Sequence, residues 1–152
     1  MSALAALLKN EAALVVRFRD TLLREQEILR AGTSDELADI NTKKLALAES
    51  LNTLGAERAQ ALSPGQESTT DMHAWLAAHP RDTESAKLWA GLLAVAREAR
   101  GINEVNGSLI NALHQKTSDA LSILTRSESE QSLYSRDGQA ASTTGSRIID
   151  SA

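Results

Sequence analysis

The segment LLREQEILRAGTSDELADINTKKLAL, residues 22–47, contains a turn between two stretches that match when the chain is folded back on itself. With the turn at residues 30–34, the numbers of facing residues add up to about 69, so that Leu29 faces Ile40. Apolar residues three and four apart form one face of a helix, and a seven-residue repeat forms a seam between two helices. The pattern therefore predicts an antiparallel helical hairpin. Its seam positions are Leu8, Glu11, Val15, Phe18, Leu22, Glu25 and Leu29, facing Leu62, Arg58, Leu54, Leu51, Leu47, Lys44 and Ile40.

Four charged residues interrupt this apolar seam, and each acid falls opposite a base. Glu11 faces Arg58, and Glu25 faces Lys44. An acid and a base in one site could act as catalytic groups, but the matching register favours cross-helix ion pairs that fix the alignment. We interpret them as register-fixing pairs, each contributing about 0–1 kcal/mol if partly solvated.

Composition limits the class of protein. The 152 residues suffice for one domain, and aromatic residues make up only 3%, so Leu and Ala must fill the core, as is typical of helices. A net charge of −4 gives no reason to expect nucleic acid or an anionic membrane as a partner. The chain has no cysteine, no stretch near the roughly 20 apolar residues of a membrane span, and no basic residue ahead of its apolar N-terminal residues. We expect a cytoplasmic protein without membrane insertion.

Capping and helix-breaking residues divide the remaining chain. Gly32 ends the first helix, and Thr33 and Glu36 have the spacing of a capping box that starts the second. The expected helices are residues 2–31, 33–62, 71–79 and 83–126. The predicted fold class is all-α: a hairpin, a short connecting helix and a third long helix form one elongated coiled-coil-like bundle domain over residues 1–134. Residues 135–152, rich in Gly, Ser and Thr, are expected to be a disordered, flexible tail.

The third long helix is expected to be longer than the hairpin. It would span about 66 Å, whereas each hairpin helix would span about 42 Å. It should therefore lose its neighbours near Asn111, although Leu113, Leu121 and Leu124 keep it apolar beyond that point. An uncovered apolar face marks a site for a partner. A bend at Gly101 or Gly107, or cover by a second copy, are the alternatives.

The polar residues do not predict an enzyme. His73 and His79 are six residues apart and so do not share a helix face, and no cluster resembles a metal or cofactor site. His114 allows a histidine phosphotransfer module as an alternative, but the lysine of that motif would follow after three residues, whereas Lys116 follows after two. Asn103 and Asn106 lie on one helix face and are expected to form a polar layer with the Glu25–Lys44 pair.

Two motifs in order give the chain a family resemblance. Asn103-x-x-Asn106-Gly107-x-Leu109-Ile110 is followed by Leu133-Tyr134-Ser135-x-x-Gly138, after a leucine-rich first helix and Trp75-Leu76 in a short segment. Together these resemble the FlgN family of flagellar type III export chaperones over nearly the whole chain. The order of the two motifs carries the resemblance, since leucine patterns are common to helical bundles.

The resemblance implies a chaperone that binds the hook-associated (hook–filament junction) proteins FlgK and FlgL, prevents their premature assembly and delivers them to the export apparatus. It implies a monomer or weak homodimer and docking on the export gate protein FlhA through Leu133 and Tyr134. A homo-oligomeric coiled-coil adaptor remains a further alternative. The client-binding residues that the resemblance implies are Ile110, Leu113, Thr117, Ala120, Leu121 and Leu124.

Overall fold

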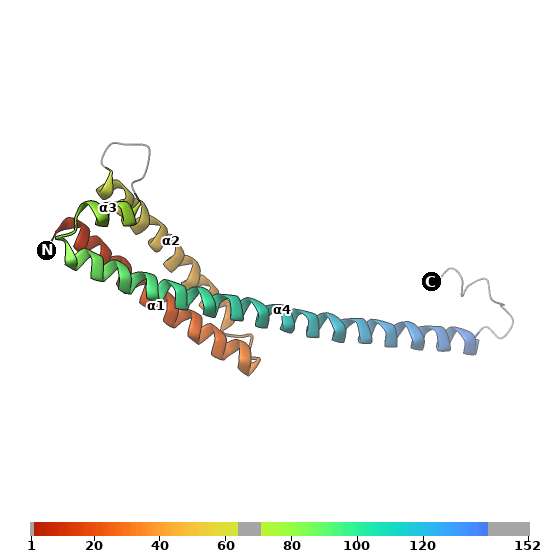
Figure 1. Ribbon diagram of the computed structural model, residues 1–152. Helices are drawn as coiled ribbons and strands as arrows, with labels where there is room; N and C mark the ends of the chain where they lie inside the picture. Colours follow the sequence, from red (N-terminus) through yellow and green to blue (C-terminus); the bar gives the residue numbers. More distant parts are fainter. Residues whose placement is uncertain (1, 64–70, 140–152) are drawn as a thin grey trace. The chain divides into compact units, whose positions relative to one another are not determined.

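All the regular secondary structure in the described part of the chain is α-helical. The computed structural model describes residues 2–63 and 71–139, with side chains up to residue 126. Its four helices are α1 (Ala3–Ala31), α2 (Leu37–Leu62), α3 (Met72–Ala78) and α4 (Thr83–Gln139) (Figure 1). The all-α prediction is confirmed. The chain divides into two compact units, Met1–Ile110 and Asn111–Ala152, which are described separately below.

The ends of α1 follow from its capping residues. The Ser2 hydroxyl accepts a hydrogen bond from the Ala5 backbone N–H at 3.1 Å. At the other end Gly32 adopts φ 73°, a left-handed conformation that favours glycine, and its N–H donates to the carbonyls of Ile28 and Leu29. The chain can therefore reverse direction directly after α1, as the sequence predicts.

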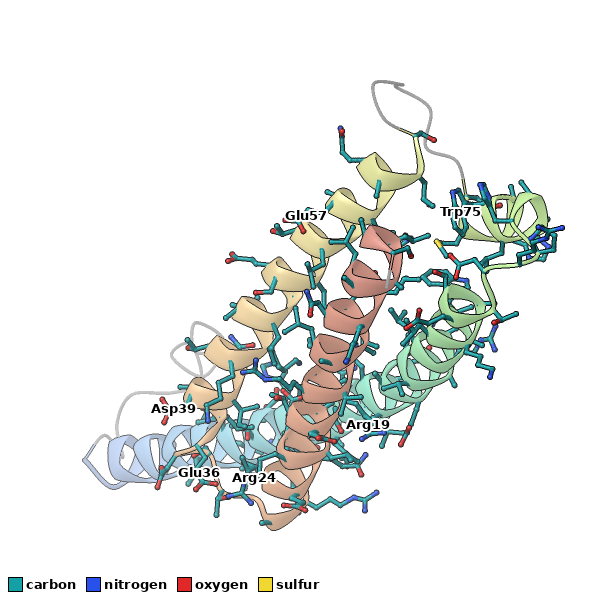
Figure 2. The ribbon with its side chains drawn as sticks, turned by 90° about the vertical axis from the view of Figure 1, so that its left-hand side faces the viewer. Arg19, Arg24, Glu36, Asp39, Glu57 and Trp75 are labelled. Atoms are coloured by element: carbon teal, nitrogen blue, oxygen red, sulfur yellow. The ribbon has the colours of Figure 1, made fainter. Side chains whose placement is uncertain are left out.

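The predicted capping box at Thr33 and Glu36 is wrong. Helix α2 begins at Leu37, and Glu36 makes no side-chain hydrogen bond to the helix end. Instead, the Glu36 carboxylate accepts from Arg24 of α1 at 3.1 Å, and both residues lie at the turn end of the hairpin in Figure 2. The Glu36 carboxylate is thus paired with Arg24 and does not cap the helix, as the capping box would require.

Helix α4 begins as expected but ends later. Asp82 accepts from the backbone N–H of Ser85 at 3.0 Å and from its hydroxyl at 2.7 Å, and these two bonds lower the pKa of the Asp82 carboxyl. The predicted end near Arg126 is wrong, because α4 continues to Gln139 and includes the first residues of the predicted tail. The serine-rich stretch carries glutamate and glutamine, which favour helices, and no proline. Residues 140–152 lie outside the described part.

The hairpin has the predicted register. Arg58 donates to both carboxylate oxygens of Glu11, at 2.8 and 3.2 Å, and the Lys44 ammonium lies 3.1 and 3.2 Å from those of Glu25. Glu11 and Glu25 are only 5% and 3% exposed. Both predicted ion pairs are therefore formed in the predicted register, and α1 and α2 run antiparallel (Figure 1).

Within the first unit, α4 lies along α1 and completes both charged sites. The Asn106 amide, 1% exposed, donates to the Leu22 carbonyl at 2.8 Å and to Glu25 at 2.9 Å. At the other site, the Arg58 guanidinium lies 4.7 Å from the ring centroid of Trp89. From the N-terminus of α1 onward, the residues of α4 that contact it also increase in residue number, so the two helices run parallel. We call the two sites the Glu25 layer and the Glu11 layer.

The two asparagines of the sequence motif have different environments. Asn106 joins the Glu25 layer, as the sequence predicts. Asn103 is exposed, so its predicted place in that layer is wrong. Asn103 and Asn106 are three residues, or about 300°, apart around the helix, and only the second faces α1 directly.

An apolar core joins the helices beyond the Glu11 layer. Leu4 and Leu8 of α1 pack with Leu62 of α2 and Met72 of α3. Trp75, labelled on α3 in Figure 2, and Leu76, Leu88 and Trp89 cover this cluster. Burying these side chains stabilises the end of the hairpin at which α3 and the start of α4 pack.

Charge reversal tests the Glu25 layer. Glu25→Lys brings a second cation against Lys44 and removes one of the two acceptors of the Asn106 amide, so we expect a loss of about 3–5 kcal/mol in the free energy of unfolding. Adding Lys44→Glu should recover only part of this loss, because the Asn106 amide keeps only the Leu22 carbonyl as an acceptor. Urea unfolding followed by circular dichroism measures both variants. Absence of any recovery would show that residues 25 and 44 do not interact.

Asn106→Asp tests the contact between α4 and this layer. The new carboxylate would lie beside Glu25 in a buried site, and we expect the free energy of unfolding at neutral pH to fall by about 3 kcal/mol. Asn103→Asp makes the same chemical change at an exposed position of the same helix and should alter stability by less than about 0.5 kcal/mol. Equal effects of the two substitutions would contradict the packing of Asn106 against α1.

Candidate partner-binding surface

The second unit begins with an exposed amphipathic part of α4. Of residues 111–126, whose side chains are described, all are exposed except Leu113, which is half-buried. Leu121 is 59% exposed and Leu124 62% exposed. We define the α4 stripe as five residues spaced three and four apart, which places them on one face of the helix. They are Leu113, Thr117, Ala120, Leu121 and Leu124.

Thr117 fits this apolar stripe because its hydroxyl is already bonded. The hydroxyl donates to the Leu113 carbonyl of the same helix at 3.0 Å, and Thr125 donates to the Leu121 carbonyl at 2.8 Å. Such bonds satisfy a threonine hydroxyl locally and leave its methyl group for packing. The stripe therefore offers hydrocarbon along its whole length.

The opposite face of this part of α4 is polar. The Gln115 amide donates to the Asp119 carboxylate at 2.9 Å, one turn along the helix. Ser118 and Ser122 lie on the same side. The α4 stripe and these polar residues occupy separate faces, so this part of the helix has one surface suited to water and one suited to a partner.

The remaining predicted client-binding and docking residues have different positions. Ile110 belongs to the first unit and is 44% exposed. Leu133 and Tyr134 lie within α4, but their side chains are outside the described part. Ile123, at 67% exposed, is one of the apolar residues beyond Asn111 but not one of the predicted client-binding residues. It lies about 100° around the helix from the centre of the stripe, so a face-based criterion leaves it out.

The described residues give no sign of catalytic or metal chemistry at this surface. His114 is exposed, and its motif neighbour Lys116 is exposed as well. Across the described ranges, no group of three or more His, Cys, Asp or Glu residues could hold a metal ion. No helix in those ranges is long and apolar enough to cross a membrane.

Comparisons with known proteins identify the family. The family model described as "FlgN protein" matches residues 1–142, which is most of the chain. No curated protein and no solved structure matches. The FlgN family is a family of flagellar export chaperones and not of enzymes. The match covers both units and confirms the resemblance seen in the sequence: the chain belongs to the FlgN family.

Proposed function

We propose that this chain is a cytoplasmic chaperone for hook–filament junction proteins of the FlgK and FlgL type. It binds a client segment on the α4 stripe, prevents premature assembly and delivers the client to the export apparatus. The exposed stripe in a member of a flagellar export chaperone family is the observation that supports this most directly. The predicted Ile110 contact belongs to the same proposal, although Ile110 lies in the first unit.

The chemistry of the stripe defines the client segment. It offers leucine and methyl groups with no unsatisfied hydroxyl, so an apolar helix face is the complementary surface. Burying about 1,000 Å² of apolar surface at about 25 cal/mol per Å² gives a gross gain of about 25 kcal/mol. The ordering of a disordered client cancels most of this gain. Binding can therefore be tight enough to protect the client and weak enough to release it.

Delivery requires a second contact, which we assign to Leu133 and Tyr134. These residues follow the α4 stripe in sequence, and the family resemblance makes Tyr134, the only tyrosine of the chain, the counterpart of a tyrosine linked to docking on the export gate protein FlhA. Separate residues for client and gate would let both proteins be bound during transfer. A monomer or weak homodimer suits this role, because a tight dimer through the stripe would cover the client site.

Leu121→Asp combined with Leu124→Asp tests the client site. Two carboxylates on the stripe should weaken binding of FlgK from the same organism by about 100-fold or more, because two leucines lose about 3 kcal/mol or more of apolar burial. Isothermal titration calorimetry measures the affinity. Both leucines are about 60% exposed, so thermal unfolding should change little.

The matched control places the same charges on the opposite face. Ser118→Asp with Ser122→Asp should bind FlgK like the unchanged protein, since neither serine belongs to the stripe. Equal loss in both double variants would point to a general charge effect and contradict the stripe as the client site. A collapse of thermal stability in the leucine variant would instead assign those leucines to a core.

Tyr134→Ala tests the docking contact separately. We expect weaker binding to the cytoplasmic domain of FlhA, by about tenfold or more if a buried aromatic ring is lost, with unchanged affinity for FlgK. Tyr134→Phe keeps the ring and separates its packing from the hydroxyl. Pull-down with purified FlhA domain, quantified over a concentration series, gives the affinities. Unchanged FlhA binding by Tyr134→Ala would remove this residue from the gate contact.

A further inference from the structure

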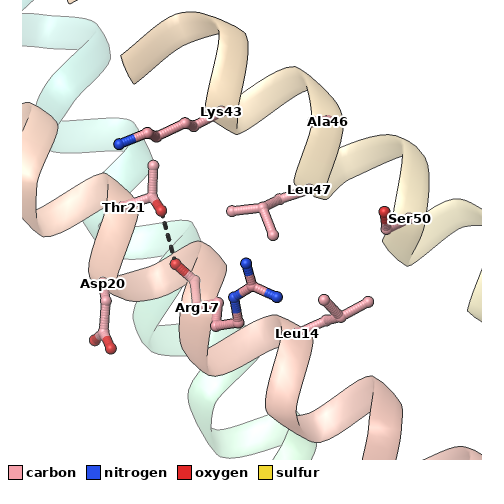
Figure 3. Close-up of a pocket in the computed structure, with 8 residues that line it drawn as sticks. All are labelled: Leu14, Arg17, Asp20, Thr21, Lys43, Ala46, Leu47 and Ser50. Carbon is pink, nitrogen blue, oxygen red and sulfur yellow. Dashed lines mark hydrogen bonds between the residues drawn. The ribbon is translucent and has the colours of Figure 1, made fainter. Parts of the chain in front are cut away.

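A groove runs between α1 and α2 on the surface of the first unit. Its volume is about 530 Å³, and Leu14 of α1 and Leu47 of α2 are its half-buried apolar residues (Figure 3). Neither of the two charged layers contributes to its lining. We call this site the hairpin groove. Its volume falls within the range of about 300–1,000 Å³ that is common for ligand-binding sites.

Two cations line the hairpin groove without an acidic partner among the described residues. Arg17 comes from α1 and Lys43 from α2, and no described residue forms an ion pair with either. Asp20 lies in the same lining, but Arg19 holds its carboxylate at 3.1 Å. Arg19 in turn binds Glu98 of α4 at 3.3 Å. Asp20 is thus paired with Arg19, which does not line the groove, whereas Arg17 and Lys43 remain available to a ligand.

The Thr21 hydroxyl, another polar group of the groove, does not need a hydrogen bond from a ligand. The Thr21 hydroxyl already donates to the Arg17 carbonyl at 2.8 Å, as the dashed line in Figure 3 shows. The Arg17 guanidinium points toward the space between Leu14 and Leu47 in the same view. A ligand therefore meets the Arg17 guanidinium between the two leucines and a second positive charge from Lys43 of α2.

The shape of the groove suits a helix. On α1 the lining extends from Leu14 to Thr21, which is two turns or about 10 Å. The main-chain groups of α1 and α2 are bonded within their own helices, so an added strand would find no backbone partners here. A helix satisfies its own backbone, and its residues at i, i+4 and i+7 cover the same two turns.

We propose that the hairpin groove binds an amphipathic helix of a second protein, with an apolar stripe flanked by carboxylates. The carboxylates pair with Arg17 and Lys43, and the apolar side chains pack on Leu14 and Leu47. With a net charge of −4, the chain as a whole repels an acidic ligand, so the attraction must come from local cations such as these two. The hairpin groove shares no residue with the α4 stripe, which belongs to the other unit.

A pair of designed peptides tests the charge requirement. Both are 18-residue helices with leucine at i, i+4, i+7 and i+11, one flanked by glutamate and the other by lysine. Titrated into the full-length protein at low salt, the glutamate peptide should bind at least about tenfold more tightly by fluorescence anisotropy. Higher salt should weaken its binding, and NMR should show shifts at the methyl groups of Leu14 and Leu47.

Charge reversal in the groove supplies the decisive comparison. Arg17→Glu with Lys43→Glu should reverse the preference, so that the lysine peptide binds more tightly. Lys87→Glu with Arg97→Glu makes the same change in net charge at exposed positions of α4 outside the groove lining and should retain the preference for glutamate. Affinity for FlgK should stay unchanged in both variants, which keeps this test separate from that of the client site.

Three outcomes would overturn the proposal. Failure of the glutamate peptide to bind, or equal binding of both peptides, would remove the charge requirement. A preference that Arg17→Glu with Lys43→Glu leaves unaltered would place the binding site elsewhere. Self-association of the unchanged protein that the groove variant abolishes would identify a second copy of this chain as the occupant, in place of another protein.

Discussion

The Glu25 carboxylate, buried between three helices, controls the alignment of the first unit. Lys44 binds it from α2, and Asn106 binds it from α4. A slip of α2 by one heptad would bring Leu37 or Leu51 opposite Glu25 and leave a buried charge without a partner, at a cost of about 3–5 kcal/mol. The Glu11 layer, about 21 Å further along α1, imposes the same condition a second time. We therefore expect the polar contacts to favour this register over its alternatives, while apolar packing supplies most of the stability.

The hairpin could be predicted because its signals agree. The spacing of the leucines, the left-handed glycine at position 32 and the opposed charges all indicate the same register. The capping box failed because spacing alone cannot show that Arg24 competes for the Glu36 carboxylate. Asn103 and Asn106 could be placed on the long helix, but which of them faces α1 depends on how α4 packs. The end of α4 was missed because serine-rich composition outweighed the helix-forming glutamates.

The two candidate binding surfaces differ in how well sequence reveals them. The α4 stripe follows from apolar periodicity on a helix longer than its neighbours, and the exposure of Leu121 and Leu124 agrees with the expectation. The hairpin groove has no such periodicity, because its lining alternates apolar, small and charged residues from two helices. Only the packing of α1 on α2 shows that Arg17 and Lys43 share a site while Asp20 is engaged by Arg19.

Because α2 and α4 both bind the Glu25 carboxylate, the detachment of one helix affects the other. Detaching α4 removes the Asn106 donor and exposes the Glu25–Lys44 pair to water, which weakens what holds α2. Detaching α2 leaves Glu25 with a neutral amide as its remaining side-chain partner. Loss of either α2 or α4 therefore weakens the contacts that Glu25 makes with the other helix. We expect the first unit to unfold as a single cooperative unit. An intermediate in which only two of these three helices are packed would be poorly populated. Its leucines would therefore be exposed to other proteins only briefly, which limits aggregation.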